Sequence, residues 1–242
     1  LVKNIFLKKI KKKEILCIIP ARGGSRGIKD KNIVKINNKE LINYTIETSI
    51  KLKKYCDIVI STDSKKIYSK CHFKKNLIFN GLRPKWLSNS KSLTKNVVKY
   101  ELKKTENMLD KKYKYVLLLQ PTCPIRDYKK ILKAFKLIKN KNIDTVISIS
   151  DVNANHPYRM KIIKKGLLRN FMNFKKENMT PRQKLPKIFI RSGSIYLISV
   201  KSFLKYDSLV GNSCYGIELF GDETINIDTK NDLEFFKYKM EC

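Results

Sequence analysis

Short apolar runs alternate with longer stretches of helical spacing along most of this chain. Five runs predict strands: Ile15–Pro20, Asp57–Ile60, Leu77–Phe79, Tyr115–Leu119 and Thr145–Ser150. Apolar residues at helical intervals predict the helices that lie between them: Leu41–Leu52, Lys65–Cys71, Lys95–Leu109 and Tyr128–Ile138. Strands that alternate with helices in this way predict an α/β domain with a mostly parallel sheet.

The alternation breaks over about residues 152–187. This segment is rich in Asn, Lys and Pro and holds two short β-like pieces, Tyr158–Ile163 and Leu167–Phe171. We expect it to leave the main sheet as an excursion. A strand at Ser194–Ser199 and a closing helix at Leu233–Met240 then return to the domain.

The start of the chain differs from the rest. We expect a basic N-terminal extension at residues 1–14, followed by one domain over residues 15–242. Lysines interrupt the apolar residues of the extension, so we expect no signal peptide. The longest apolar runs are too short to cross a bilayer, and we therefore expect no membrane partner.

Positive charge is the strongest bias of the composition. The chain has 53 Lys and Arg against 21 Asp and Glu, a formal net charge of +32. Only eight of the basic residues are arginines, and the lysines are spread along the whole chain. A nucleic-acid-binding protein concentrates its charge and favours arginine for phosphate contacts. We expect no nucleic-acid partner, although a basic nucleic-acid-binding protein stays the alternative from another class.

The cysteines favour a reducing compartment. The six cysteines are scattered without a C-x-x-C pair, and the only histidines are His72 and His156. This spacing argues against a zinc site and indicates reduced thiols in a cytoplasmic protein.

A glycine-rich loop, Pro20–Asn32, follows the first predicted strand. Its glycines allow the backbone to approach a polyanion, and Arg22, Arg26 and Lys31 offer positive charge for phosphates. The spacing matches neither a P-loop nor a dinucleotide fingerprint. Because ligands bind beyond the carboxyl ends of strands in such sheets, we expect chemistry at this loop and at the loops after Leu119 and Ser150.

Six motifs in a fixed order carry a resemblance to a known family. They are Ile19–Gly27 with Lys31-Asn32, Val59–Asp63, Arg83-Pro84 with Leu87, Leu118–Pro124, Pro181–Pro186 with Gly193–Tyr196, and Ile227–Thr229. With these motifs the chain resembles the acylneuraminate cytidylyltransferases, also called CMP-sialic acid synthetases. The resemblance implies a Rossmann-like, three-layer nucleotidyltransferase domain. It also implies a homodimer, in which the excursion at residues 152–187 reaches the partner's active site.

The resemblance further implies the reaction and the residues that serve it. CMP would pass from CTP to the anomeric hydroxyl of an acidic nine-carbon sugar of the N-acylneuraminate type, with release of pyrophosphate and with Mg²⁺ as cofactor. Nucleotide-binding residues would be Ala21, Arg22, Gly23, Asn32, Arg83, Ser92 and Thr94. Arg22, Arg26 and Lys31 would be catalytic, stabilising charge on the phosphates. The sugar would be bound by Gln120, Thr122, Arg182 and Tyr196. Asp228 would bind the metal.

Arginine is concentrated at these motifs. Six of the eight arginines lie in or beside them: Arg22, Arg26, Arg83, Arg126, Arg182 and Arg191. In a lysine-rich chain, this placement fits sites that need planar, bidentate donors.

The chain departs from the family at the proposed metal site. Asn226 stands where the family has the first carboxylate of an Asp-x-Asp motif, which leaves Asp222 or Glu223 as alternative carboxylates. An N-cap is the structural alternative for Asp228. Ser90 and Ser192 also differ from the family pattern. These departures keep open a legionaminic- or pseudaminic-type sugar as the substrate. A sugar-1-phosphate nucleotidyltransferase is the alternative of related chemistry.

Overall fold

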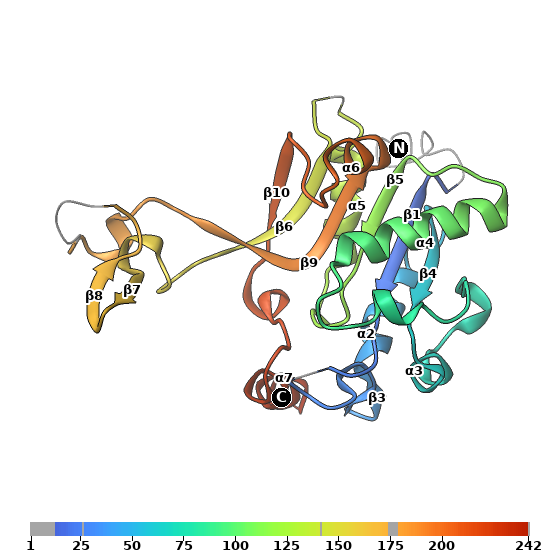
Figure 1. Cartoon of the computed structure of the whole chain (residues 1–242), viewed down its shortest axis with the longest axis horizontal. Coiled ribbons are helices and arrows are strands. Elements are labelled where there is room, and N and C mark those ends of the chain that lie inside the picture. Colours follow the sequence, from blue (N-terminus) through green and yellow to red (C-terminus); the bar gives the residue numbers. More distant parts are fainter. Residues whose placement is uncertain (1–12, 26, 141, 174–178, 242) are drawn as a thin grey trace.

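A six-stranded sheet forms the centre of the protein (Figure 1). The structure is a computed structural model that describes residues 13–25, 27–140, 142–173 and 179–241. The strand order is β10-β6-β9-β5-β1-β4. These strands are β1 (Ile15–Pro20), β4 (Cys56–Ser61), β5 (Tyr115–Leu118), β6 (Thr145–Asp151), β9 (Phe189–Ser199) and β10 (Cys214–Glu218).

Five of the six strands run parallel, and β9 is antiparallel to both of its neighbours. Strand β1 pairs in parallel with β4 and β5, and β10 pairs in parallel with β6. Strand β9 lies between β5 and β6 and pairs antiparallel with each. The expected mostly parallel sheet is therefore confirmed.

Helices cover both faces of this sheet. They are α2 (Leu41–Ile50), α3 (Lys65–Lys70), α4 (Thr94–Leu109), α5 (Tyr128–Leu137) and α6 (Val200–Tyr206). The last helix, α7 (Lys230–Glu241), belongs to a separate cluster. Successive side chains of a strand point to opposite faces. Cys17 and Ile19 of β1 join a buried cluster with α2, α3 and α5, whereas Leu16 and Ile18 join another with α4 and α6. This arrangement is the expected three-layer α/β domain.

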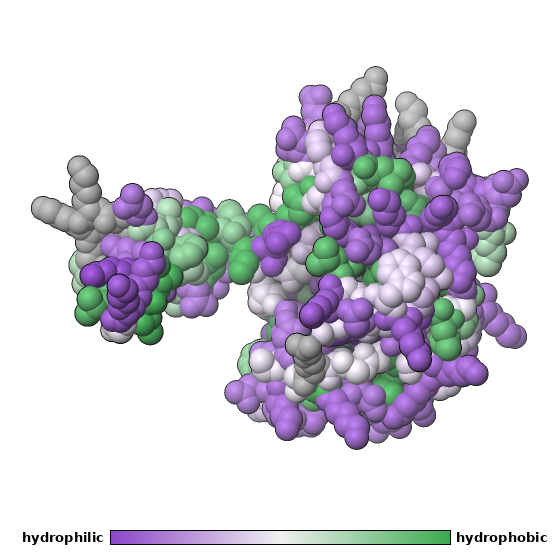
Figure 2. All heavy atoms as spheres, in the orientation of Figure 1, coloured by the Kyte–Doolittle hydropathy of each residue, from purple (hydrophilic) through white to green (hydrophobic). Residues whose placement is uncertain are grey.

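An arm, residues 152–188, projects from the sheet (Figure 1). Its tip is an antiparallel hairpin of β7 (Lys161–Lys164) and β8 (Leu167–Asn170). The end of β6 pairs with the start of β9 beyond a bulge at Ile147–Ile149, so the two strands leave the sheet together. The excursion was expected at about residues 152–187. Apolar side chains show on its surface among hydrophilic ones (Figure 2), and the most exposed include Ile163, Leu168, Phe171 and Met179.

Helix α7 closes a smaller apolar cluster beside the start of α2, apart from the two clusters on the sheet (Figure 1). Phe236 is fully buried there against Ile36 and Leu41, which flank the small hairpin of β2 (Lys35–Ile36) and β3 (Lys39–Glu40). Tyr44 and Phe236 meet edge to face with ring centroids 5.6 Å apart. This packing brings the chain just before α7 next to the glycine-rich loop.

Some expected elements differ from the structure. The strand expected at Leu77–Phe79 is wrong, because only an isolated bridge joins Ile78 to Val59. The strand expected at Ser194–Ser199 is the inner half of β9. Strand β10, helix α6 and the β2–β3 hairpin were not expected. The basic extension lies mostly outside the described residues, although Glu14 accepts backbone hydrogen bonds from Lys114 and Tyr115 at the sheet edge.

No helix in the described part of the chain combines the length and the apolar character needed to cross a membrane. Of the six cysteines, the five that the structure describes carry free thiols, and all of these except Cys214 are buried.

Candidate active site

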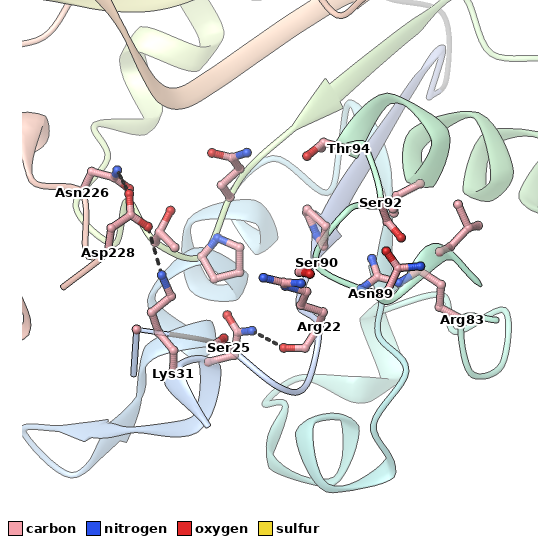
Figure 3. A pocket seen from close by; sticks show the side chains of 18 residues that line it. Arg22, Ser25, Lys31, Arg83, Asn89, Ser90, Ser92, Thr94, Asn226 and Asp228 are labelled. Atoms are coloured by element: carbon pink, nitrogen blue, oxygen red, sulfur yellow. Dashed lines mark hydrogen bonds and ion pairs between the residues drawn. The ribbon is translucent and has the colours of Figure 1, made fainter. Parts of the chain in front are cut away.

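A polar pocket of about 530 Å³ lies at the carboxyl ends of β1 and β5. Four segments line it: the glycine-rich loop, the loop that leads into α4, the loop after β5 and the chain before α7. The lining residues that were expected from the sequence are Arg22, Lys31, Asn32, Arg83, Ser92, Thr94, Gln120, Thr122 and Asp228. Figure 3 shows Asn226, Asp228 and Lys31 on one side, and Arg83, Ser92 and Asn89 on the other.

The pocket is electropositive. Among the described residues that line it, Arg22, Lys31 and Arg83 are cations and Asp228 is the only carboxylate. Fixed positive charge without matching carboxylates favours a polyanionic ligand. The pocket can therefore hold a triphosphate group.

The glycine-rich loop is fixed by hydrogen bonds between its own ends and to the turn after β4. Asn32 is buried, and its Nδ2 donates to the Arg22 carbonyl at 2.8 Å. The backbone N–H of Gly23 donates to Asp63 Oδ1 at 2.8 Å. Gly27 lies against Asp228, since a Cβ at this position would stand 2.7 Å from the Asp228 carbonyl oxygen. Gly27 is thus needed for the close approach of the two segments.

Lys31, Asp228 and Asn226 form a short polar chain at the pocket. Lys31 Nζ donates to Asp228 Oδ1 at 3.0 Å and to the Ile227 carbonyl at 2.8 Å. Asn226 Nδ2 donates to the other carboxylate oxygen, Asp228 Oδ2, at 2.6 Å. The Asp228 side chain is 62% exposed, so it faces the pocket while both of its oxygens are oriented.

Asp228 does not cap the following helix. Thr229 and Asp232 form the reciprocal hydrogen bonds of a cap: Asp232 N–H donates to Thr229 Oγ1 at 3.2 Å, and Thr229 N–H donates to Asp232 Oδ2 at 2.7 Å. The capping alternative for Asp228 is therefore wrong, and its carboxylate is left to the pocket.

The two alternative carboxylates are paired elsewhere. Asp222 forms an ion pair with Lys239 at 3.3 Å, and Glu223 pairs with Lys130. Neither lines the pocket. Among the described residues, no group of three or more His, Cys, Asp or Glu side chains could hold a metal by itself.

The chemistry of Asp228 fits one protein ligand of Mg²⁺. An exposed carboxylate at an anion pocket is the type of ligand that Mg²⁺ takes together with substrate phosphates and water. Asn226 supplies no second charge, and its Oδ1 lies 3.6 Å from the Cys123 thiol. Asp228 would then be the single anionic anchor of the ion.

Arg83 forms the opposite side of the pocket. Its side chain is buried, with Nε donating to Ser88 Oγ at 3.2 Å and its backbone N–H donating to the Thr62 carbonyl at 2.8 Å. Burial, together with the nearby Arg22, lowers the pKa of Arg83, while Asp63 and Glu101 oppose this shift. The guanidinium stays charged at neutral pH and is held rigidly toward the cavity wall.

The loop after β5 brings Gln120 and Thr122 to the pocket and links it to the chain before α7. The Ile227 N–H donates to the Thr122 carbonyl at 2.8 Å, and the Cys123 thiol contacts Ser192 and Asn226. Gly193 has φ +80°, and a Cβ there would lie 2.9 Å from Gln120 Oε1. Glycine therefore leaves the space that the Gln120 amide occupies.

Not every expected residue lines this pocket. Ala21 is fully buried beneath it, Gly23 contacts Asp63, and Tyr196 packs in the cluster under α4. Arg182 is exposed on the arm, in a short 3-10 helix at Arg182–Lys184, away from the pocket of its own chain. Arg26 lies outside the described residues. The lining residues that were not expected include Ser25, Asn89 and Val97, whose residue types carry no distinctive signal.

Comparison with known proteins adds family information to this geometry. A family model described as cytidylyltransferase matches residues 16–208. The CMP-N,N'-diacetyllegionaminic acid synthase of Campylobacter jejuni is 30% identical, and the match covers 92% of each chain. The N-acylneuraminate cytidylyltransferase of Streptococcus agalactiae is 26% identical over 90% of this chain, which spans about half (51%) of that protein.

The chain belongs to the cytidylyltransferase family.

The fold agrees with this assignment. A solved structure of CMP:2-keto-3-deoxy-manno-octonic acid synthetase in complex with CTP has a TM-score of 0.64 at 14% identity, covering 94% of this chain and 98% of its own. This cytidylyltransferase is therefore an enzyme, a nucleotidyltransferase, rather than the basic nucleic-acid-binding protein considered as the alternative.

Proposed function

We propose that this cytidylyltransferase transfers CMP from CTP to the anomeric hydroxyl of an acidic nine-carbon sugar and releases pyrophosphate. The observation that carries the proposal is that the glycine-rich loop and the loop after β5 line one pocket. The Lys31–Asp228 contact lies in the same pocket. Residues proposed for the nucleotide and residues proposed for the sugar thus face a common cavity.

The transfer requires charge stabilisation more than covalent chemistry. The sugar oxygen forms a bond to the α-phosphorus while the bond from that phosphorus to the bridging oxygen breaks, and the hydroxyl proton leaves to solvent or a nearby base. Negative charge grows on the oxygens around the α-phosphorus and on the pyrophosphate. Arg22 and Lys31 line the pocket from the glycine-rich loop and would stabilise this charge. Arg26, which lies outside the described residues, is proposed as a third donor.

The remaining contacts orient the two substrates. Asn32, Arg83, Ser92 and Thr94 would hold cytosine and ribose, with the backbone of Ala21 and Gly23 forming the base of this side. Gln120 and Thr122 would hydrogen-bond the sugar, since both line the pocket from the loop after β5. Holding both substrates in line lowers the entropic part of the barrier.

Mg²⁺ is the proposed cofactor, held by Asp228 together with the phosphates. Bound there, the ion would neutralise charge on the phosphates and raise the electrophilicity of the phosphorus. Lys31 and Asn226 would orient the Asp228 carboxylate toward it.

For the sugar, we propose a legionaminic- or pseudaminic-type nonulosonate ahead of N-acetylneuraminate. The support is the full-length similarity to the C. jejuni legionaminic acid enzyme, whereas the N-acylneuraminate enzyme matches over half of its length. The departures at Asn226, Ser90 and Ser192 also fall at or beside the pocket.

We also propose that two copies assemble and that Arg182 reaches the sugar carboxylate in the partner's pocket, beside Tyr196. In its own chain Arg182 lies on the arm, and the arm exposes apolar side chains such as Ile163 and Phe171 that a second copy would cover. The free thiols support the cytoplasm as the proposed location.

Pyrophosphate release tests the function directly. The full chain is incubated with each of the four NTPs and with legionaminic, pseudaminic and N-acetylneuraminic acid. We expect release with CTP and at least one of these sugars, strongest with a legionaminic- or pseudaminic-type acid. No release from CTP with any acidic nine-carbon sugar would overturn the proposal, and release only with N-acetylneuraminic acid would overturn the order of the substrates.

A further inference from the structure

Arg126 is a half-buried cation next to the loop after β5, and its guanidinium is enclosed by three hydrogen-bond acceptors. It lies between the loop after β5 and α5, one residue before Asp127, whose side chain caps that helix by accepting from the Lys129 N–H. Among the described residues, the titratable neighbours of its guanidinium are the thiols of Cys123 and Cys17, and no carboxylate acts on it. Partial burial of an arginine without an acidic partner is unfavourable unless its donors are hydrogen-bonded, because a charge withdrawn from water needs compensation.

Its N–H groups instead donate hydrogen bonds to three different segments of the chain. Arg126 Nε donates to the Ser194 carbonyl of β9 at 2.9 Å, and one terminal nitrogen donates to Thr45 Oγ1 of α2 at 2.8 Å. The other terminal nitrogen donates to the carbonyl of Gln120. Lysine, with a single nitrogen on a flexible stem, cannot span these three directions.

Two of the three acceptors lie at or beside Gln120: its own carbonyl and the carbonyl of Ser194. The backbone of Gln120 is held by Arg126 and by the turn in which the Cys123 N–H donates to the same carbonyl at 3.2 Å. Ser194 follows Gly193, whose missing Cβ leaves room for Gln120 Oε1. Arg126 therefore fixes both the residue that lines the pocket and the strand that bounds its side chain.

We propose that Arg126 is a positioning residue for the sugar side of the pocket, holding Gln120 in place against β9 and α2. The inference rests on the proposed function, because Gln120 is the residue proposed to hydrogen-bond the sugar. Arg126 itself touches no substrate.

The test compares Arg126→Met, Arg126→Lys and Thr45→Val in the full chain, with steady-state kinetics for CTP and for the sugar that the wild type uses. Arg126→Met removes all three hydrogen bonds, and we expect the KM for the sugar to rise by roughly tenfold to a hundredfold. The KM for CTP should stay within about twofold. Thr45→Val removes only the bond to α2, so its effect should have the same direction and be smaller.

Arg126→Lys adds a readout that a purely structural role would not move. Burial lowers the pKa of Arg126 to about 10, with the neighbouring Cys123 and Cys17 thiols opposing the shift, and the same burial would lower the pKa of a lysine. Burial also raises the pKa of the Cys17 thiol, to about 12, and that of the Cys123 thiol. A charged lysine can still hold Gln120, and a neutral one holds it less well. The sugar KM of Arg126→Lys, relative to wild type, should thus rise as pH increases through the lowered pKa.

The outcomes separate the two proposals. An active wild type with a sugar-selective loss in the Arg126 variants supports both. An active wild type whose Arg126→Met, Arg126→Lys and Thr45→Val variants change the two KM values equally, or not at all, overturns the positioning role and leaves the function intact. A wild type that is inactive with every acidic sugar overturns the function and the role with it. If thermal unfolding shows that Arg126→Met does not fold, the KM values of Thr45→Val and Arg126→Lys test the positioning role.

Discussion

At the scale of single residues, Asp228 is held from two sides. Lys31 contacts one carboxylate oxygen at 3.0 Å, and the Asn226 amide contacts the other at 2.6 Å. An aspartate at 226 could not donate this hydrogen bond and would add a negative charge beside Asp228. With asparagine at 226, the site orients one carboxylate. With aspartate there, two carboxylates would repel each other until a cation binds between them.

We expect Asp228→Asn to nearly abolish turnover, because no other described carboxylate lines the pocket. Asn226→Asp should keep or raise activity and lower the Mg²⁺ concentration required for half-maximal rate, since a second carboxylate would help to hold the ion. Titration of Mg²⁺ against the wild type and both variants measures this. Near-normal turnover in Asp228→Asn, together with loss in Asp222→Asn or Glu223→Gln, would mean that the metal is held at another carboxylate.

The cations of the glycine-rich loop give a second prediction at this scale. Arg22→Ala and Lys31→Ala should each lower kcat about a hundredfold, or roughly 3 kcal/mol, because each removes one preorganised donor to the phosphates. Lys29→Ala is the matched control, since Lys29 lies on the same loop and does not line the pocket. A change in the KM for CTP with kcat unchanged would limit Arg22 and Lys31 to ground-state binding.

At the scale of elements, apolar runs predicted the buried strands well. Strands β1, β4, β5 and β6 are bounded within two residues of expectation, because their side chains are buried on both faces and the runs are continuous. Strand β10 escaped prediction because its first three residues are exposed and it includes Gly216. The antiparallel direction of β9 also has no signal in its own residues, since it depends on the path of the arm.

The site was predictable to the extent that its residues follow strands. The loops after β1 and β5 carry Lys31 and Gln120 to one edge, as the strand order requires. Arg83 and Asp228 were predicted only from the resemblance to the family. They lie far from these loops in the sequence, so no local pattern indicates that they line the same pocket. Arg126 has no pattern that marks its role, because the role depends on three acceptors from separate elements.

Strand β4 gives a prediction about stability. Asp57 accepts hydrogen bonds from Lys111 Nζ at 2.7 Å and Tyr113 Oη at 2.8 Å, and its other oxygen lies 2.9 Å from Lys13 Nζ. Burial alone would raise the pKa of Asp57, but these contacts outweigh it and hold the pKa below its ordinary 3.8. The carboxylate therefore stabilises the fold above that value, and the contribution is lost as pH falls through the folded-state pKa.

We expect Asp57→Asn to lower the free energy of unfolding by about 2 kcal/mol near neutral pH. The difference from wild type should shrink below pH 3.8. Tyr113→Phe removes one of the three contacts and should cost about 1 kcal/mol. Urea unfolding of the wild type, Asp57→Asn and Tyr113→Phe over a pH series measures these free energies. If the difference between wild type and Asp57→Asn stayed constant across the acid range, Asp57 would not be the ionised group assumed here.

At the scale of the whole molecule, the arm has little to pack against in a single chain. Phe171 is 62% exposed and Leu168 is 63% exposed; Leu168 lies in β8 and Phe171 directly follows this strand. If two copies cover these side chains, Phe171→Lys and Leu168→Lys should shift the protein toward a monomer in light scattering. Tyr238→Lys on α7, with a side chain as exposed, at 63%, is the control and should leave the mass unchanged. A wild type that is monomeric and fully active would contradict the dimer.

Mixed dimers test whether the arm completes the partner's pocket. Arg182→Ala alone should raise the KM for the sugar more than that for CTP, because a guanidinium suits the sugar carboxylate. Lys31→Ala and Arg182→Ala are then mixed in equal amounts and allowed to exchange subunits. One site of each mixed dimer has both residues, so random assortment restores about a quarter of wild-type activity. A mixture that is no more active than the average of its two components would show that each chain uses its own Arg182.

Strand β9 also sets the order in which the sheet can form during synthesis. It is the only strand that joins β5 to β6, so the strands made before it constitute two separate pieces, β4-β1-β5 and β6. Until residue 199 has left the ribosome, the edge of β5 has no partner, and β6 has none on either side. Unpaired apolar edges are prone to wrong association, and contacts between distant parts of a chain form slowly. A nascent chain of this protein therefore carries an open, apolar half-sheet from the synthesis of β5 to that of β9, and its need for chaperones should fall once β9 closes the gap.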